Sequence, residues 1–183
     1  MIVRYIEKSL MNEIFSESFK RVLTPTYLGV FDKNTREDVT FALDQLDINS
    51  CINITDRGAF DEWFNYEVFT LHKRLFPLYK DDVIVCKDNP YTYTARLMNA
   101  ILKDMLIHPV IFLSELDDFI QLFHPILTNK YLKAVPDLDI NKVNQIGGKE
   151  DYLKLVKGYR DLLDMDLCDK NRWVLNMRYG IDH

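Results

Sequence analysis

Cysteine, histidine, glycine and proline are all scarce in this chain of 183 residues. The three cysteines, Cys51, Cys86 and Cys168, are far apart and include no close-spaced pair, so neither a zinc site nor a dithiol redox motif is expected. We expect all three to be reduced residues of the core, because unpaired cysteine is commonly buried. The six glycines include no glycine-rich loop ending in Lys-Ser or Lys-Thr, which argues against a nucleotide phosphate loop.

Long hydrophobic runs are missing as well. The first eight residues meet charged side chains too early for the apolar part of a signal peptide, and no stretch approaches the roughly 20 apolar residues that cross a bilayer. We therefore expect an intracellular, cytoplasmic protein with no membrane segment. Hydrophobic residues make up 48% of the chain, which is more than a disordered chain has, so the chain should fold on its own.

An excess of basic charge is also absent. The formal net charge is −5, which argues against a protein that simply coats nucleic acid, since Lys and Arg dominate such binding. The charges are unevenly distributed: residues 1–86 hold 10 basic and 14 acidic side chains, and residues 87–183 hold 13 and 14. A local basic surface in the second half is therefore compatible with the overall acidity.

Helical periodicity runs through most of the chain. The spacing of apolar residues predicts helices over about 3–23, 35–46, 60–75, 93–105, 112–123, 127–135 and 153–163, and a last helix near 173–177 that ends at Gly180. Two short alternating segments, 51–54 and 83–86, are the candidates for strands. The sequence therefore predicts a mainly α protein with at most short strands.

The predicted helices fall into two groups. Pro77 and the charged residues 80–82 end the helix over 60–75, and Asn89 followed by Pro90 supplies an N-cap with proline at the first helical position. We place a boundary between these signals, which gives an amino-terminal helical lobe, 1–86, and a carboxy-terminal helical lobe, 87–183. The length also allows a single core.

Local signals add detail to three of these helices. Thr35, followed three residues later by Asp38, resembles a capping box. His108-Pro109 separates two helices as a helical hairpin. In the helix over 60–75, aromatic residues belong to an apolar stripe that we interpret as core, while the opposite face carries Asp61, Glu62, Glu67 and Lys73.

Side chains that could perform catalysis are few. His72, His108 and His124 have no second candidate ligand at metal spacing, so structural roles are expected for them. Arg178 and His183 have the four-residue spacing that one class of metal-independent RNases uses, which leaves an RNase as an alternative function. Otherwise we expect no enzymatic activity and no cofactor.

One stretch of the second half combines basic and aromatic residues. Lys and Arg outnumber Asp and Glu by seven to four between residues 128 and 160. Basic side chains contact phosphates, and an exposed tyrosine can stack on an unpaired base. We expect Lys154, Lys157 and Arg160, three residues apart, to form one ridge. The predicted DNA-binding residues are Lys130, Lys133, Lys149, Lys154, Lys157, Arg160 and Tyr159.

Three segments of the second half are similar to one protein family. They are the residues from Asn89-Pro90 to Arg96-Leu97-Met98, the segment 116–122 (Leu-Asp-Asp-Phe-Ile-Gln-Leu), and the segment 157–166 (Lys-Gly-Tyr-Arg-Asp-Leu-Leu-Asp-Met-Asp). In this order they resemble helices in the carboxy-terminal lobe of the helicase-loading (helicase assembly) proteins of T-even-type bacteriophages. The family is basic, whereas this chain is acidic.

This resemblance implies a replication adaptor. Such a protein is all-helical with two lobes, binds forked and single-stranded DNA, contacts the single-strand binding protein and loads the replicative helicase, with no enzymatic activity and no cofactor. The net acidity of this chain favours a different alternative, a phage-type adaptor or inhibitor that binds proteins and not DNA.

Overall fold

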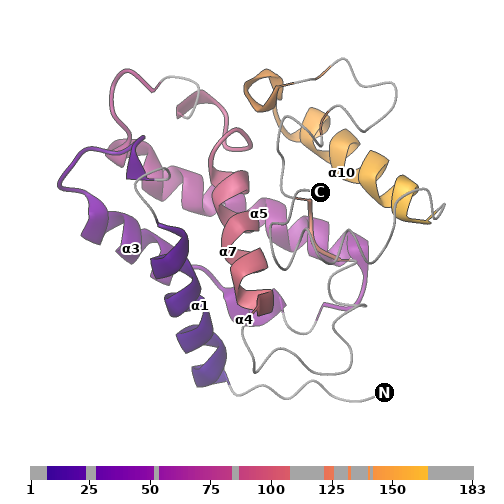
Figure 1. Ribbon diagram of the computed structural model, residues 1–183, viewed down its shortest axis with the longest axis horizontal. Helices are drawn as coiled ribbons and strands as arrows, with labels where there is room; N and C mark the ends of the chain where they lie inside the picture. The colour runs from indigo at the N-terminus through magenta and orange to yellow at the C-terminus, as the bar shows by residue number, and fades with distance from the viewer. Residues whose placement is uncertain are drawn as a thin grey trace.

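The architecture is helical, as the sequence predicts. The computed structural model describes residues 8–23, 28–51, 54–83, 87–107, 122–125, 132, 140 and 142–164. In these residues the regular elements are helices, and extended pairing is limited to one antiparallel bridge between Phe31 and Tyr79 (Figure 1). The mainly α prediction is therefore confirmed. None of the described helices is long and apolar enough to cross a membrane.

Among the described residues, the first half of the chain contains the α-helices α1 (Lys8–Val22), α3 (Arg36–Asp44), α4 (Ile48–Cys51) and α5 (Arg57–Leu75). The first predicted strand is wrong, because its first residue, Cys51, is the last residue of α4. Cys51 is buried and forms no disulfide, as expected. Thr35 precedes α3 as predicted, but the capping box is not formed, since its hydroxyl donates to the carbonyl of Asp32 at 2.7 Å.

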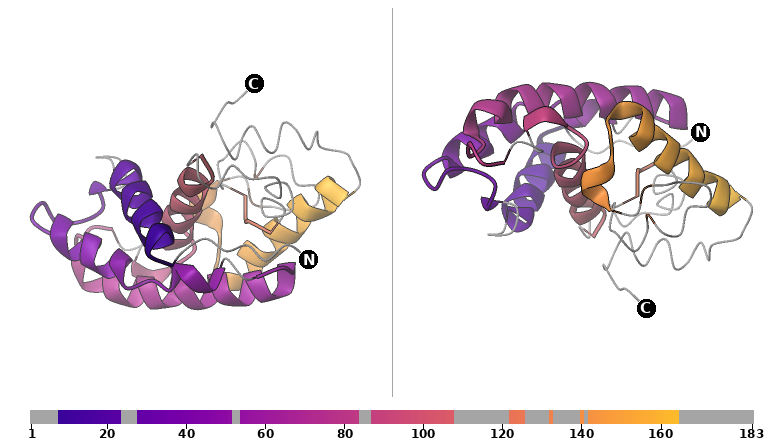
Figure 2. Two further views of the ribbon diagram at one scale, coloured as in Figure 1. Left: turned by 90° about the horizontal axis from the view of Figure 1, so that it is seen from below. Right: turned by 90° about the horizontal axis from the view of Figure 1, so that it is seen from above.

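Helix α5 is the longest described element, and its ends have clear physical causes. The carboxylate of Asp56 accepts a hydrogen bond from the backbone N–H of Ala59 at 2.9 Å, which caps the first turn. At the other end Pro77 lies in a short 3-10 turn, η1 (Phe76–Leu78), as its helix-breaking character predicts. In both views of Figure 2, α5 runs along one edge of the molecule with α1 and α7 (Thr94–Ile107) on its inner side.

Helix α7 begins later than the Asn89-Pro90 pair predicts. The side-chain carbonyl of Asn89 accepts a hydrogen bond from the backbone N–H of Tyr91 at 2.9 Å, and the side-chain amide donates to the carbonyl of Ile146. These bonds hold a turn that precedes the helix, so Thr94 is the first helical residue. The helix therefore begins four residues after Pro90, the residue that the Asn-Pro pair predicts as its first position.

The carboxy-terminal described residues form a short 3-10 turn, η3 (Val143–Gln145), and helix α10 (Lys149–Asp164). Gly148, just before α10, has a φ of 140°, a backbone conformation that glycine adopts without strain. The helix predicted over 153–163 is confirmed. The segment 108–121, with the predicted hairpin at His108-Pro109, lies outside the described residues, as do 84–86, 126–131, the predicted last helix and the Arg178/His183 pair.

The hydrophobic core crosses the boundary that the sequence suggests near residue 86. One cluster of buried side chains includes Phe19 of α1, Phe64 of α5, Leu97 of α7 and Leu155 of α10. Helix α1, before the boundary, packs along α7, after it (Figure 1). One hydrophobic cluster of the described residues therefore includes side chains from both sides of residue 86.

Candidate functional site

The predicted basic ridge is only partly present on the surface of α10. Lys149, Lys154 and Lys157 are exposed, whereas Tyr159 is 3% exposed and Arg160 is 8% exposed. The prediction that Arg160 continues the ridge is wrong because Arg160 is six residues after Lys154, which places it about 120° away from Lys154 around the helix axis. Tyr159 cannot stack on a base from its buried position. Lys130 and Lys133 lie outside the described residues.

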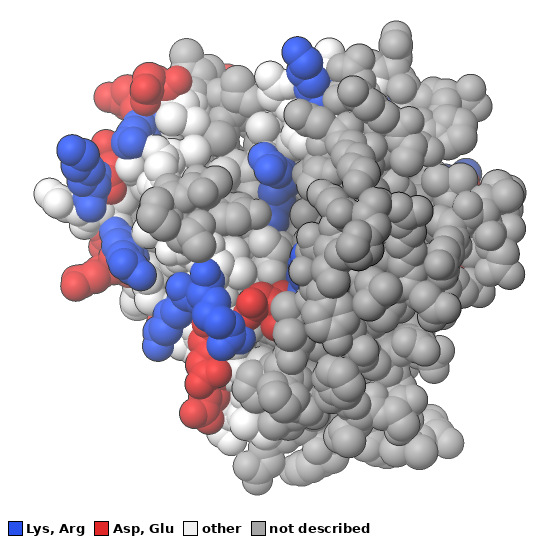
Figure 3. Space-filling view, in the orientation of Figure 1, with Lys and Arg blue, Asp and Glu red and all other residues white. Residues whose placement is uncertain are grey.

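Acidic side chains accompany the exposed lysines of α10. The amine of Lys154 lies 3.9 Å from the carboxylate of Asp151, and Glu150 and Asp161 are exposed on the same helix. Over the described part of the face seen in Figure 3, Lys and Arg are likewise interspersed with Asp and Glu. On this face the described residues therefore form no broad positively charged surface, and a phosphate contact on α10 would rest on its three exposed lysines.

Arg160 belongs instead to a buried polar network that joins α10 to α5. Its two terminal nitrogens donate to the two carboxylate oxygens of Asp61, each at 2.8 Å, and one also donates to the carbonyl of Leu122 at 2.8 Å. Oδ1 of Asp61, which accepts from one of these nitrogens, also accepts from Nε2 of His124 at 2.8 Å. Asp61 therefore ties together two segments that are far from it in sequence.

The network continues from His124 into the core. Nδ1 of His124 lies 2.9 Å from the hydroxyl of Tyr152, and that hydroxyl accepts from the side-chain amide of Asn99 at 2.9 Å. In the neutral imidazole, Nε2 donates to the aspartate and Nδ1 accepts the tyrosine proton. The rings of Phe64 and His124 are 4.3 Å apart at their centroids, which fixes the imidazole plane.

Burial controls the ionisation of this network. Burial lowers the pKa of His124 below its ordinary value, although the hydrogen bond to Asp61 acts in the opposite direction. Burial would raise the pKa of Asp61, but hydrogen bonds from His124 and Arg160 outweigh it and keep that pKa low. Burial raises the pKa of Tyr152. An Asp-His-Tyr chain resembles a catalytic relay, yet His124 and Tyr152 are fully buried, so the arrangement is one that holds helices together.

His72 has a similar structural role, as the sequence suggests. Its Nε2 donates to the carbonyl of Lys87 at 2.9 Å, and its Nδ1 lies 3.2 Å from the hydroxyl of Thr94. Burial lowers the pKa of His72 below its ordinary value, so this imidazole is also neutral near pH 7. In the part of the chain that the structure describes, no group of three His, Cys, Asp or Glu residues could hold a metal ion.

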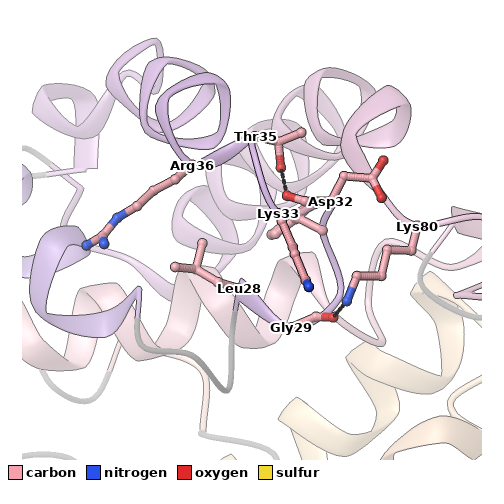
Figure 4. Close-up of a pocket in the computed structure, with 8 residues that line it drawn as sticks. Leu28, Gly29, Asp32, Lys33, Thr35, Arg36 and Lys80 are labelled. Carbon is pink, nitrogen blue, oxygen red and sulfur yellow. Dashed lines mark hydrogen bonds between the residues drawn. The ribbon is translucent and has the colours of Figure 1, made fainter.

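A surface pocket of about 320 Å³ lies at the start of α3 (Figure 4). The amine of Lys80 donates to the carbonyl of Gly29 at 2.6 Å, and the amine of Lys33 points to the same side, whereas Arg36 points away from it. Asp32 supplies its carboxylate. This set of side chains has neither a nucleophile with an adjacent base nor a group of metal ligands. The amine of Lys80 already donates to a backbone carbonyl. The lining residues are Leu28, Gly29, Phe31, Asp32, Lys33, Thr35, Arg36 and Lys80.

The outer face of α5 is the surface feature that sequence reasoning missed. Phe60 and Phe64 are buried, as expected, but Tyr66 is 68% exposed, Phe69 is 41% exposed and Phe76, just after the helix, is 49% exposed. Glu67, which we assigned to the polar face, is 4% exposed and faces inward. The signal that could have found this surface is the spacing of the aromatic residues themselves, since positions 66, 69 and 76 lie on one side of a helix.

Comparison of the chain with protein-family models, with curated proteins and with solved structures gives no match. The candidate site therefore rests on the geometry of the described residues. We define the α5 surface as the outward side chains of Glu62, Tyr66, Phe69, Lys73 and Phe76. It is an aromatic strip with one acid and one base, which suits contact with another protein rather than chemistry.

Proposed function

We propose that this chain is a non-enzymatic adaptor that binds protein through the α5 surface. The observation that carries the proposal is the exposure of Tyr66, Phe69 and Phe76 along a single helix whose opposite side is the core of the molecule. A surface helix normally directs polar side chains to water, so an aromatic strip on its outer side is unusual for a surface that meets solvent alone.

The chemistry of the strip suits a protein partner. Aromatic side chains bury about 150–250 Å² each, and tyrosine is among the residues that dominate the free energy of protein association. The phenol of Tyr66 adds a hydrogen-bonding group at the edge of the apolar strip. A partner helix laid along α5 would cover all three rings at once, because they follow one line on the helix surface.

The polar groups of the interior support a binding role over an enzymatic one. His124 and His72 both form hydrogen bonds that connect distant segments of the fold, and burial favours the neutral form of each imidazole. The pocket beside α3 offers lysines and one carboxylate without a reactive pair. The net charge of −5 agrees with a protein partner better than with a phosphate backbone.

A photo-crosslinking amino acid at position 66 tests this proposal, with the same amino acid at Glu13, an exposed position of α1, as the matched control. In an extract of the source cells, the probe at 66 should give discrete protein adducts that the probe at 13 does not give. Each adduct partner, once purified, should bind the wild-type chain and lose at least about tenfold in affinity when Tyr66→Lys removes an aromatic contact. Equal labelling from the two positions would contradict the proposal.

A second candidate function is the DNA-binding, helicase-loading adaptor that the resemblance implies. The exposure of Lys149, Lys154 and Lys157 on α10 favours it. Forked DNA and the matching duplex, titrated across a salt series, test it: binding should be fork-selective and should weaken as salt rises. Replacement of the three lysines with glutamine should weaken binding and flatten its salt dependence. The charge-matched control replaces Lys20, Lys33 and Arg36, and unchanged binding by the α10 variant would contradict this candidate.

A further inference from the structure

The α5 surface has the spacing of a helix that pairs with another helix. Starting one turn before Glu62, its outward positions alternate in steps of three and four residues along the whole helix. Such a 3-4 alternation keeps one line of side chains facing a partner helix. The first of these positions, Ala59, is partly exposed, and the last, Phe76, lies in the turn after α5. The six positions are Ala59, Glu62, Tyr66, Phe69, Lys73 and Phe76.

These six positions are complementary to themselves when the helix direction is reversed. With two copies of α5 antiparallel and related by a two-fold axis near residues 67 and 68, Tyr66 of one copy lies opposite Phe69 of the other. In the same register Glu62 lies opposite Lys73, and the small Ala59 lies opposite the large Phe76. Each contact occurs twice, as a two-fold interface requires.

We infer that the α5 surface binds a second copy of this chain, with the two α5 helices antiparallel. This inference rests on the proposed function, because it names the partner of the same surface. Charge decides the orientation: a parallel pairing in register would set Glu62 against Glu62 and Lys73 against Lys73, whereas the antiparallel pairing sets opposite charges together. It also places the two helix dipoles in opposite directions.

Two of the three rings of the surface are held from within the molecule. Phe69 packs edge-to-face on Tyr91, with centroids 5.7 Å apart and the planes at 88°. Phe76 packs on His72 with centroids 6.2 Å apart at 79°. Tyr66, the most exposed of the three, lies at the centre of the antiparallel register, next to the two-fold axis. Phe69 and Phe76 are therefore anchored from within the chain, while Tyr66, one turn before Phe69, is the ring most open to a partner.

Lys73 and Glu62 give the test its specificity. Among the described residues, neither forms an ion pair within its own chain, so their substitution leaves the known salt bridges intact. Glu62→Lys sets lysine against Lys73 at both ends of the interface, and Lys73→Glu sets glutamate against Glu62. A mixture of the two variants restores opposite charges at both ends of a mixed dimer. The loss of affinity in each single variant relative to the wild type separates the antiparallel pairing from a parallel one, in which the wild-type charges already repel.

Sedimentation equilibrium from low micromolar to several hundred micromolar protein measures the association. The wild-type chain should dimerise, each single variant should weaken its own dimer by at least about tenfold, and the mixture should regain the wild-type affinity as a heterodimer. Glu13→Lys on α1 is the control and should change nothing. A wild-type chain that stays monomeric at every concentration would overturn the dimer. The proposed protein-binding function would then still be decided by the crosslinking experiment at position 66. A dimer that both variants leave unchanged would overturn the α5 register.

Discussion

Arg57 and Arg160 each form a two-pronged salt bridge with an aspartate, and the two pairs differ mainly in burial. The terminal nitrogens of Arg57 lie 2.6 and 2.9 Å from the carboxylate oxygens of Asp164, and those of Arg160 lie 2.8 Å from those of Asp61. The side chains of the first pair are 31% and 57% exposed, against 10% and 26% for the second. The two pairs have nearly equal geometry, while the second pair is more buried and also bonds to Leu122 and His124.

Replacing each arginine with methionine should therefore change stability by different amounts. Removing one partner of a buried pair costs about 3–5 kcal/mol, because the remaining charge is left uncompensated. Asp61 keeps a hydrogen bond from His124 and some contact with solvent, so we expect about 2–4 kcal/mol for Arg160→Met. The exposed pair should contribute about 0–1 kcal/mol, which is the expected cost of Arg57→Met.

Urea denaturation followed by circular dichroism measures both free energies of unfolding. If the uncompensated Asp61 charge causes the loss, then Arg160→Met should cost less when Asp61→Asn is already present, and a double-mutant cycle measures that coupling. Equal losses for Arg57→Met and Arg160→Met, or a coupling energy near zero, would refute the assignment of the buried network as the clamp between α10 and α5.

Three other substitutions test the polar network around His124 and the capping of α5. Burial lowers the pKa of His124, so below about pH 6.5 the unfolded chain takes up a proton that the folded imidazole does not. The free energy of unfolding should therefore be highest above that pH and should decrease as the pH falls below it. Urea denaturation at several pH values should show a smaller decrease for His124→Gln. Tyr152→Phe should cost about 1–3 kcal/mol, because His124 and Asn99 lose their shared partner, and a loss near zero would contradict the network. Asp56→Ala should cost about 1 kcal/mol through the first turn of α5, measured against Asp56→Asn, which keeps a capping oxygen.

Local patterns predicted the helices because their causes are local. The apolar spacing of α5 and α10 and the break at Pro77 follow from neighbouring residues, and all three are confirmed. The predicted start of α7 at Pro90 was wrong because the side chain of Asn89 bonds to Tyr91 and to the distant Ile146. These bonds hold a turn that continues to Thr94, where the helix begins. Bonds between distant segments are invisible to periodicity.

The site was harder to predict than the fold for the same reason. Arg160 seemed free to contact phosphate because its partner, Asp61, is 99 positions away in the sequence. Composition does not distinguish Phe64, which faces the core, from Tyr66, which faces outward. Counting positions around the helix separates these two residues, since they are about 200° apart.

Hydroxyl-radical footprinting of Tyr66 tests the central claim, that the α5 surface is a protein contact, most directly. Phe41 of α3 is a matched internal reference, because it is 67% exposed and Tyr66 is 68% exposed. The purified chain is labelled when dilute, when concentrated, and when dilute in an extract of the source cells. The account predicts that labelling of Tyr66 relative to Phe41 falls when the chain is concentrated or in the extract. An unchanged ratio under all three conditions would contradict it.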